Sequence, residues 1–378
     1  MLNRRNLLSI LIIAIVLTIV IKATGLEAEE TDLSKKAVLL FSYEASFWGV
    51  HDENKGIVKG LATTGYAEGR NIEIIRLYMN TKSVNKTVEQ METAAIQLVA
   101  QIRKTDPDIL FIMDDDALRH VGAKFLDTDL PIVFGGVNFL VTESDYGRIS
   151  DSRRVPLADS LEQPGHNITG VMEKPALSAG FKLLHQILPH AKNALFISDN
   201  SVVGTQLLQV AGWRTELKIA PFHIVDEIYT NSFEKLKKTI LEYQDKVESI
   251  ILFIPWSLEY EDGKHVPHKE VVSWMLRNNK RPGIAYLDIL AEEGYLCGVV
   301  VDMVQQGFHA GVMGGRILNG ANAGNIPITD PVANRITINL ARAHQLGIAI
   351  PFEVLKSADV VYKKMTAYPE YKIEELKP

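Results

Sequence analysis

Short apolar segments recur along this chain, and each one ends in a cluster of polar or aromatic residues. Residues 36–41, 109–113 and 194–198 are segments of this kind. Longer amphipathic stretches lie between them, such as 87–105, in which apolar residues recur at helical spacing. Short strands that alternate with helices in this way predict an α/β fold with doubly wound parallel sheets.

The length of the chain and the course of this pattern predict two lobes. The chain has 378 residues, which is more than one ordinary hydrophobic core accommodates. One α/β series runs from residue 36 to about 133, and a second of similar size continues from about 176 to 287. No long flexible linker separates them. We therefore expect two Rossmann-like lobes, each built on a parallel sheet.

Composition argues against nucleic acid as a partner and excludes a disulfide within the chain. The formal net charge is −6 and is spread along the chain, so there is no basic footprint for nucleic acid. Cys297 is the only cysteine, which excludes an intrachain disulfide. The fold must therefore depend on its hydrophobic cores.

The N-terminus predicts export. Arg4 and Arg5 precede an uncharged apolar stretch from Leu7 to Ile21, and acidic residues follow from Glu27. An apolar stretch of this length matches a signal peptide better than a spanning helix, which needs about 20 residues. We expect residues 1–25 to be a signal peptide or an uncleaved N-terminal anchor. In either case the rest of the chain is periplasmic or extracytoplasmic.

Candidate ligand contacts are the polar and aromatic residues at the carboxyl ends of the predicted strands, where open α/β sheets bind ligands. Aromatic faces stack on flat ligands and hold cations, clustered aspartates favour an ammonium or other cationic group, and asparagine both donates and accepts. Aspartates after a strand also occur as helix caps, asparagines as turn residues, and aromatic residues as packing between lobes. The candidates are Tyr43, Ser46, Trp48, Asp114, Asp115, Asp116, Asn138, Asp199, Asn200, Trp256 and Asp288.

Motifs for catalysis, cofactors and metals are missing from the sequence. It contains no G-x-S-x-G elbow, no H-E-x-x-H helix and no dinucleotide fingerprint after the first strand. The glycines of segment 304–318 lack the lysine of a phosphate-binding loop, so we expect them to serve close helix packing on the first lobe. His265 and His268 have metal-ligand spacing but lie in a charged loop. We predict a protein that is not an enzyme and has no cofactor or metal.

Several segments carry a family resemblance. Residues 167–171 read NITGV, 338–351 read INLARAHQLGIAIP, and 355–361 read LKSADVV. With these motifs in this order, the chain from about Ala37 to Tyr362 resembles the periplasmic substrate-binding proteins of ABC transporters, in the branch of tryptophan- and tyrosine-type binders. The N-terminal half is also similar to ligand-sensing ectodomains of bacterial histidine kinases and diguanylate cyclases, through 42–48, 78–82 and 114–118.

The resemblance implies a type I periplasmic-binding fold with three crossovers between the lobes. It places lobe 1 at 36–168 and 295–325, and lobe 2 at 169–294 and 326–365. It further implies a monomer that captures a small molecule, such as an amino acid, an amine or another small polar or aromatic solute, and delivers it to an ABC permease. The alternative is a stand-alone periplasmic sensor component that feeds a membrane signalling protein.

Overall fold

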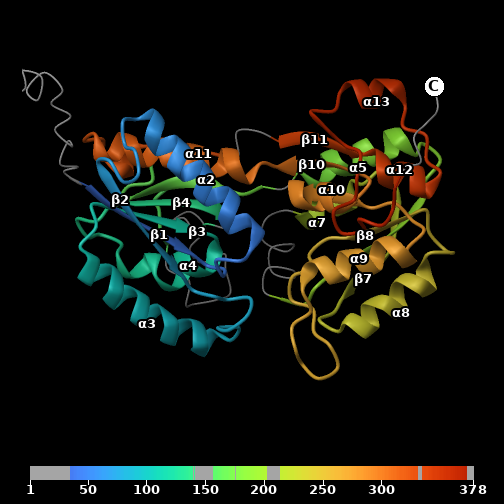
Figure 1. The fold of residues 1–378 in the computed structure, drawn as a ribbon, viewed down its shortest axis with the longest axis horizontal. Coiled ribbons are helices and arrows are strands. Elements are labelled where there is room, and N and C mark those ends of the chain that lie inside the picture. The colour runs from blue at the N-terminus through green and yellow to red at the C-terminus, as the bar shows by residue number, and fades with distance from the viewer. Residues whose placement is uncertain are drawn as a thin grey trace, which may run out of the picture.

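The fold consists of two α/β lobes that lie side by side (Figure 1). It was obtained as a computed structural model that describes residues 35–138, 140, 156–174, 176–201, 213–330 and 334–372. The predicted two-lobe α/β architecture is confirmed, and the described strands pair in parallel except for one antiparallel pair in the second lobe. None of the helices in these ranges is both long enough and apolar enough to cross a bilayer. The expected signal peptide or anchor at 1–25 lies outside the described residues.

The first lobe is built on a five-stranded parallel sheet in the order β2-β1-β3-β4-β5. Its strands are β1 (Lys35–Phe41), β2 (Ile72–Tyr78), β3 (Ile109–Met113), β4 (Ile132–Val137) and β5 (Ile168–Met172). Its helical elements are α2 (Trp48–Thr63), α3 (Val88–Thr105), α4 (Asp115–His120), α11 (Met303–Leu318) and the short 3₁₀ turns Gly122–Lys124 and Ala323–Asn325.

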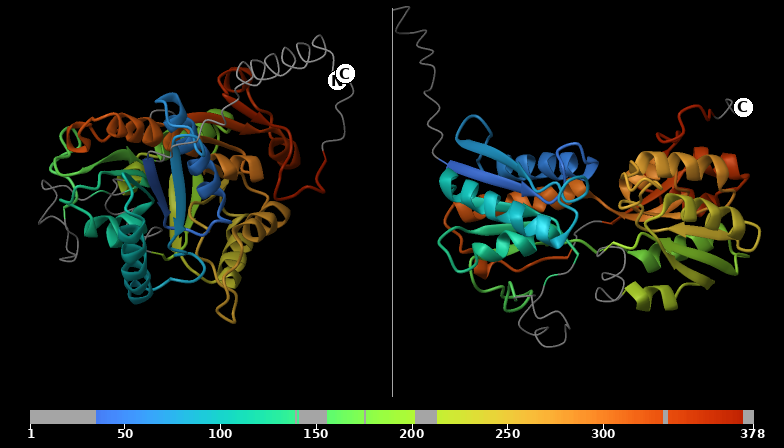
Figure 2. Two further views of the ribbon diagram at one scale, coloured as in Figure 1. Left: turned by 60° about the vertical axis from the view of Figure 1, so that its left-hand side comes forward. Right: turned by 90° about the horizontal axis from the view of Figure 1, so that it is seen from below.

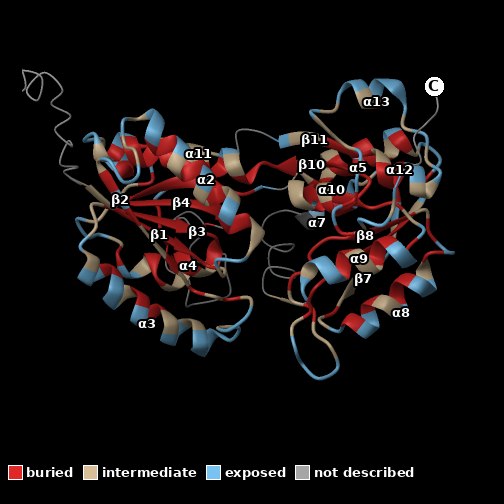
Figure 3. Ribbon diagram, in the orientation of Figure 1, coloured by how far each residue is buried: buried red, intermediate tan, exposed pale blue. Residues whose placement is uncertain are grey.

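Helices cover both faces of this sheet, which explains why its strands are apolar along their whole length. Successive side chains of β1 point to opposite faces. Val38 and Leu40 belong to the core beneath α3 and α4, whereas Ala37, Leu39 and Phe41 belong to the core beneath α2 and α11. Figure 3 shows the central strands of the first lobe as buried throughout.

Helix α3 coincides with the predicted amphipathic stretch 87–105, and local signals set its ends. The Thr87 side chain accepts from the Gln90 backbone N–H, and the Gln90 side chain accepts from the Thr87 backbone N–H, so two free donors of the first turn are satisfied. At the other end Asp106 adopts φ +50° and stops the helix, with Pro107 behind it. Asp108 then accepts from the backbone N–H of Lys36 at 2.8 Å, which aligns β3 beside β1.

The second lobe contains the remaining elements. Its strands form the groups β7-β6-β8 and β12-β11-β10-β9, which meet where the Ile250 N–H donates to the Pro282 carbonyl at 3.0 Å. The strands are β6 (Asn193–Ser198), β7 (His223–Tyr229), β8 (Ser249–Leu252), β9 (Ile284–Leu287), β10 (Cys297–Val301), β11 (Asn334–Asn339) and β12 (Val360–Tyr362). The helices are α5 (Leu177–Ile187), α7 (Trp213–Lys218), α8 (Phe233–Tyr243), α9 (His268–Asn278), α10 (Asp288–Glu293), α12 (Leu340–Leu346) and α13 (Phe352–Lys356).

The chain passes between the lobes a few residues later than the expected boundaries at 168/169, 294/295 and 325/326. Strand β5 pairs with β4, so the first lobe extends through Met172. Strand β10 pairs with β9 and β11 in the second lobe, so the return follows it. Thr329 still accepts from the Met172 N–H at 2.8 Å, which holds that segment in the first lobe. Strand pairing decides these boundaries, and a single sequence does not reveal which strands pair.

The late helix α11 packs on the first lobe, as expected, against α2 (Figures 1 and 2). Glycines on both helices make this approach close. A Cβ at Gly56 would lie 2.2 Å from the Val304 carbonyl oxygen, and a Cβ at Gly307 would lie 2.2 Å from the Glu53 carbonyl oxygen. One turn further on, Gly60 and Gly311 repeat the arrangement, with corresponding distances of 2.2 and 2.3 Å. Only glycine fits at these positions without separating the helices.

Candidate functional site

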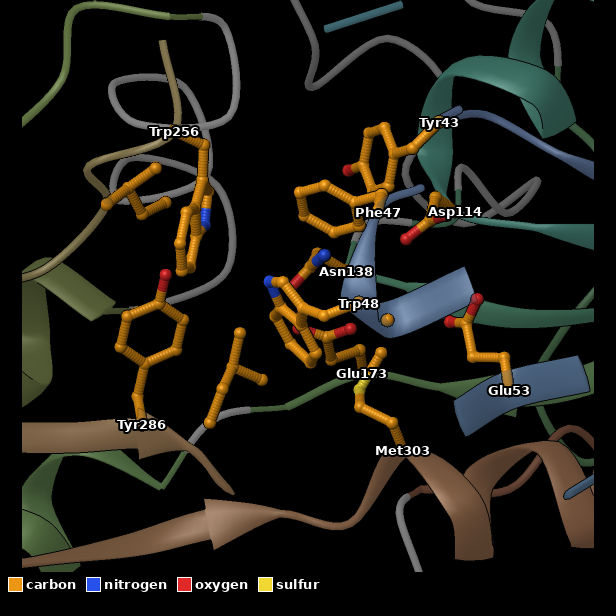
Figure 4. Close-up of a pocket in the computed structure, with 13 residues that line it drawn as sticks. Tyr43, Phe47, Trp48, Glu53, Asp114, Asn138, Glu173, Trp256, Tyr286 and Met303 are labelled. Carbon is orange, nitrogen blue, oxygen red and sulfur yellow. The ribbon is translucent and has the colours of Figure 1, made fainter. Parts of the chain in front are cut away.

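A pocket lies between the lobes and takes its walls from both (Figure 4). The volume left inside it is about 40 Å³, room for roughly three water molecules. The lining side chains therefore almost fill it. They are Tyr43, Phe47, Trp48, Gly49, Glu53, Asp114, Asn138, Glu173, Ile254, Trp256, Tyr286, Leu287 and Met303.

Aromatic rings from the two lobes meet in this pocket. Trp48, the first residue of α2, and Trp256, which follows β8, have ring centroids 6.0 Å apart. Phe47 lies 5.4 Å from Trp48 and 6.2 Å from Trp256, and Tyr43 lies 4.7 Å from Phe47. The rings of Trp48 and Trp256 thus face each other across the cleft between the lobes. We call Tyr43, Phe47, Trp48 and Trp256 the aromatic group.

The ring of His268 supports the aromatic group from behind. Its centroid lies 5.1 Å from that of Trp256, and its Nε2 is 2.9 Å from Glu293 Oε1. His265 Nε2 lies 2.8 Å from the Trp256 carbonyl oxygen. Both histidines therefore hold the loop that carries Trp256. Among the described residues no cluster of His, Cys, Asp and Glu is suited to a metal ion.

Three carboxyl groups from three different elements form the other wall. Glu53 comes from the second turn of α2, Asp114 follows β3, and Glu173 follows β5. They are 1%, 5% and 7% exposed. A Cβ at Gly136 would lie 2.8 Å from Glu53 Oε1 and 3.2 Å from Asp114 Oδ1, so both carboxyl groups converge on this glycine. We call Glu53, Asp114 and Glu173 the acidic group.

Burial and mutual repulsion raise the pKa of every member of the acidic group. Desolvation is the largest cause in each case. Repulsion from a neighbouring carboxyl group raises each pKa further. The neighbour is Glu173 for Glu53, and Glu53 for Asp114. For Glu173 it is Asp115, and the pKa of Glu173 reaches about 8. Three buried carboxyl groups this close cannot all ionise without a counter-charge. A protonated amine in the pocket would supply it.

Asp114 also has an unusual backbone. It adopts φ +68°, in a region that non-glycine residues rarely occupy. Its N–H donates to the Gly135 carbonyl at 2.8 Å, which fixes the chain between β3 and α4. Such strain is most often found at binding and catalytic sites.

Five of the residues expected from the sequence line the pocket: Tyr43, Trp48, Asp114, Asn138 and Trp256. A sixth residue, Asp115, does not line the pocket, and its carboxylate accepts hydrogen bonds from another residue of the protein. Its Oδ2 accepts from the backbone N–H and from the side-chain amide of Asn138, both at 3.2 Å. It orients Asn138 in the pocket wall.

The other five expected residues lie outside this pocket. Ser46 is in an exposed turn. Asp116 and Asn200 line a second, more polar pocket of about 360 Å³ between the lobes. Asp199 accepts from the Ser201 and Ser257 backbone N–H groups at 3.1 and 2.9 Å, as a loop cap. Asp288 accepts from Arg335 Nη2 at 2.7 Å and from the Tyr362 hydroxyl at 2.9 Å. These last two carboxylates stabilise loop and strand ends instead.

Sequence reasoning missed several residues of the pocket. Glu173 directly follows β5, so the rule that found Asp114 would also have found it. Glu53 lies four residues after Gly49 and so shares its helix face, but nothing in the sequence distinguishes it from a surface glutamate. Tyr286 sits within β9, and Met303 begins α11 after the return crossover. Only the folded chain brings Glu53, Tyr286 and Met303 to the pocket.

Among the described residues, two ion pairs lie at the rim of the cleft and at the crossovers between the lobes. Lys86 Nζ of the first lobe lies 3.6 Å from Glu259 Oε1 of the second. Lys174 and Asp330 join the first and third crossovers with an ion pair of 2.6 Å. All four side chains are well exposed, so these pairs contribute little stability. This arrangement permits the lobes to move about the crossovers.

Comparison with known proteins identifies the chain's relatives. The family model described as ABC transporter substrate binding protein matches residues 46–362. The chain is 23% identical over 313 residues to a tyrosine-binding protein of Clostridioides difficile (strain R20291), which covers 83% of this chain and 81% of that protein.

Two solved structures have a similar fold. One is a Streptococcus pneumonia ABC domain in complex with L-Trp, with a TM-score of 0.66, 22% identity and coverage of 86% of this chain and 99% of that one. The other is the ligand-free, open structure of a Clostridium difficile substrate binding protein with adhesive properties. Its TM-score is 0.63 at 20% identity, with coverage of 87% of this chain and 100% of that one.

Proposed function

The chain belongs to the ABC transporter substrate-binding protein family, and we propose that it captures a small molecule bearing an aromatic ring and a protonated amine between its two lobes. It delivers this solute to an ABC permease. The family consists of solute-binding proteins and not of enzymes, and the chain performs no chemistry on its ligand.

The observation that carries this proposal is the pairing of the aromatic group with the acidic group in one interlobe pocket. In Figure 4, Trp256 and Tyr286 lie on one side, while Asp114 and Glu53 lie on the opposite side, beyond Trp48 and Phe47. The aromatic faces suit a flat ring, and the buried carboxyl groups suit a cation. The tyrosine and L-Trp bound by the two relatives named above carry both features.

Binding requires the lobes to move. The pocket volume of about 40 Å³ is far smaller than an aromatic amino acid or amine, because Phe47, Trp48 and Trp256 occupy the space. The lobes therefore separate to admit the ligand, whose ring then packs among these side chains as the lobes close. A ligand that contacts both lobes favours the closed state, and the permease distinguishes the closed surface from the open one.

The proposed site of action is outside the cytoplasm. We take the chain to be exported through residues 1–25, either released or held at the membrane by this segment, and to act as a monomer. A cell that lacks this protein should then lose high-affinity uptake of the solute and regain it when the gene is restored. Normal uptake without the protein would argue against a role in transport.

Binding itself is tested with the purified full chain. A ligand that binds only the folded state raises the melting temperature. A thermal-shift screen over aromatic amino acids, aromatic amines, aliphatic amino acids and aromatic acids should give its largest shifts for compounds with both a ring and an amine. If aliphatic or purely anionic compounds give the largest shifts, the proposed ligand class is wrong.

A further inference from the structure

Unpaired hydrogen-bonding groups of both kinds, acceptors and donors, line the pocket. Glu53 Oε1 and Asp114 Oδ2 are buried, line the pocket and have no hydrogen-bond partner among the described residues. On the donor side, the Trp48 indole Nε1 and the Tyr286 hydroxyl are likewise buried and have no hydrogen-bond partner among the described residues. Burying unpaired polar groups is costly, and a ligand that donates several N–H bonds to the carboxyl oxygens would relieve this cost.

The charge of the pocket points the same way. Of the described residues that line it, three are acidic and none is Lys, Arg or His. Lys82 is a neighbouring cation that partly opposes the raised pKa of Asp114. Its Nζ lies 4.9 Å from the centroid of the Tyr43 ring. Lys82 lines the second, polar pocket and not this one. Among the described residues, a carboxylate on the ligand would therefore face these three acidic side chains and no cationic lining residue.

The start of a helix brings a positive partial charge to the edge of the pocket. Helix α2 begins at Trp48 with no side-chain cap, and Gly49 lines the pocket, so free backbone N–H groups lie nearby. A helix N-terminus carries about half a positive charge. Glu53 lies on the same helix, one turn after Gly49, and opposes this partial charge.

From this imbalance we propose that the site selects an aromatic amine without a free carboxylate over the corresponding amino acid. The ammonium group donates to Glu53, Asp114 and Glu173, and the ring packs among Phe47, Trp48 and Trp256. The inference rests on the proposed function, because it concerns the ligand of the same pocket. The proposed function accepts both aromatic amines and aromatic amino acids, whereas this inference favours the amines.

Isothermal titration of the full chain with a matched series tests the inference. The series is tryptamine, L-tryptophan amide, L-tryptophan and indole-3-propionate, with tyramine and L-tyrosine as a second pair. We expect each amine to bind at least tenfold more tightly than its amino acid, the amide to resemble the amine, and indole-3-propionate to bind weakest. An amino acid that binds as tightly as its amine overturns the inference but leaves the proposed function intact. That result would point to the start of α2 as the site that binds the carboxylate. If no compound of either series binds, the proposed function fails as well.

Substitutions in the acidic group test where the preference arises. Glu53→Gln and Asp114→Asn keep the shape of each side chain and remove its negative charge. Either variant should lose at least tenfold in affinity for the amine and show a smaller ratio between amine and amino acid. Glu73→Gln, on an exposed position of β2, is the matched control and should keep both. If both site variants retain the full preference, the acidic group does not cause it.

Discussion

Replacing Gly307 by alanine should destabilise the first lobe by separating α2 from α11. The added Cβ would lie 2.2 Å from the Glu53 carbonyl oxygen, whereas ordinary van der Waals contact begins near 3.4 Å. The neighbouring atom is backbone, so it cannot rotate away as a side chain would. The helices must therefore separate by about 1.2 Å, the difference between these two distances.

The expected cost follows from two opposing effects. Overpacking of a tight core costs about 1–3 kcal/mol, and occasionally more. Alanine in place of glycine inside a helix returns about 1 kcal/mol through its better helix propensity. Because the contact is with backbone on both helices, we expect the upper part of the overpacking range and a net loss of about 2 kcal/mol. For a lobe of this size that corresponds to a melting temperature lower by about 4–8 °C.

Thermal and urea unfolding followed by circular dichroism measure this loss. The control is Gly180→Ala in α5, where the nearest atom is the Ile284 Cδ1 methyl at 3.2 Å, at the end of a side chain that can rotate. Gly180→Ala should remain within about 1 kcal/mol of the wild type, because a small adjustment offsets the gain in helix propensity. Equal stability of Gly307→Ala and the wild type, or equal loss in both variants, would refute the packing argument.

Three further outcomes are expected at the pocket. Trp48→Ala and Trp256→Ala should each weaken binding of the best ligand from the thermal-shift screen about tenfold or more. The reason is that an aromatic contact is worth about 0.5–2 kcal/mol beyond the lost packing. Unchanged titration isotherms would show that the rings do not contact the ligand. The pKa of Glu173 is raised from 4.5 to about 8. Between these two pH values the folded state holds a proton that the unfolded chain releases. The contribution of Glu173 to stability therefore falls as the pH rises from 4.5 to about 8. Glu173→Gln should therefore gain stability relative to the wild type between pH 5 and 8 in melting experiments, and parallel curves would contradict the raised pKa. Small-angle scattering should show a smaller radius of gyration with saturating ligand than without it, and identical profiles would exclude closure of the lobes.

The sequence determined the class of the fold. Fully apolar strands such as β1 require helices on both sheet faces, and the alternation of strands with amphipathic helices permits little else. Local chemistry also determined element ends, as at Thr87 and Asp106 of α3. The rule that ligands bind at the carboxyl ends of parallel strands located Tyr43, Trp48 and Asp114 for the same reason: strand ends are visible in a sequence.

Only the tertiary structure decided which of these strand-end residues share a pocket and which of them are already bound. Asp114 and Asp199 both follow buried strands, yet Asp114 has an unpaired oxygen in the pocket while Asp199 caps its own loop. Glu53 becomes a site residue because the glycines of α2 and α11 fix that helix over Gly136. The distinction depends on contacts between residues far apart in sequence, such as Glu53 and Gly307, and those contacts form only when α11 returns to pack on the first lobe.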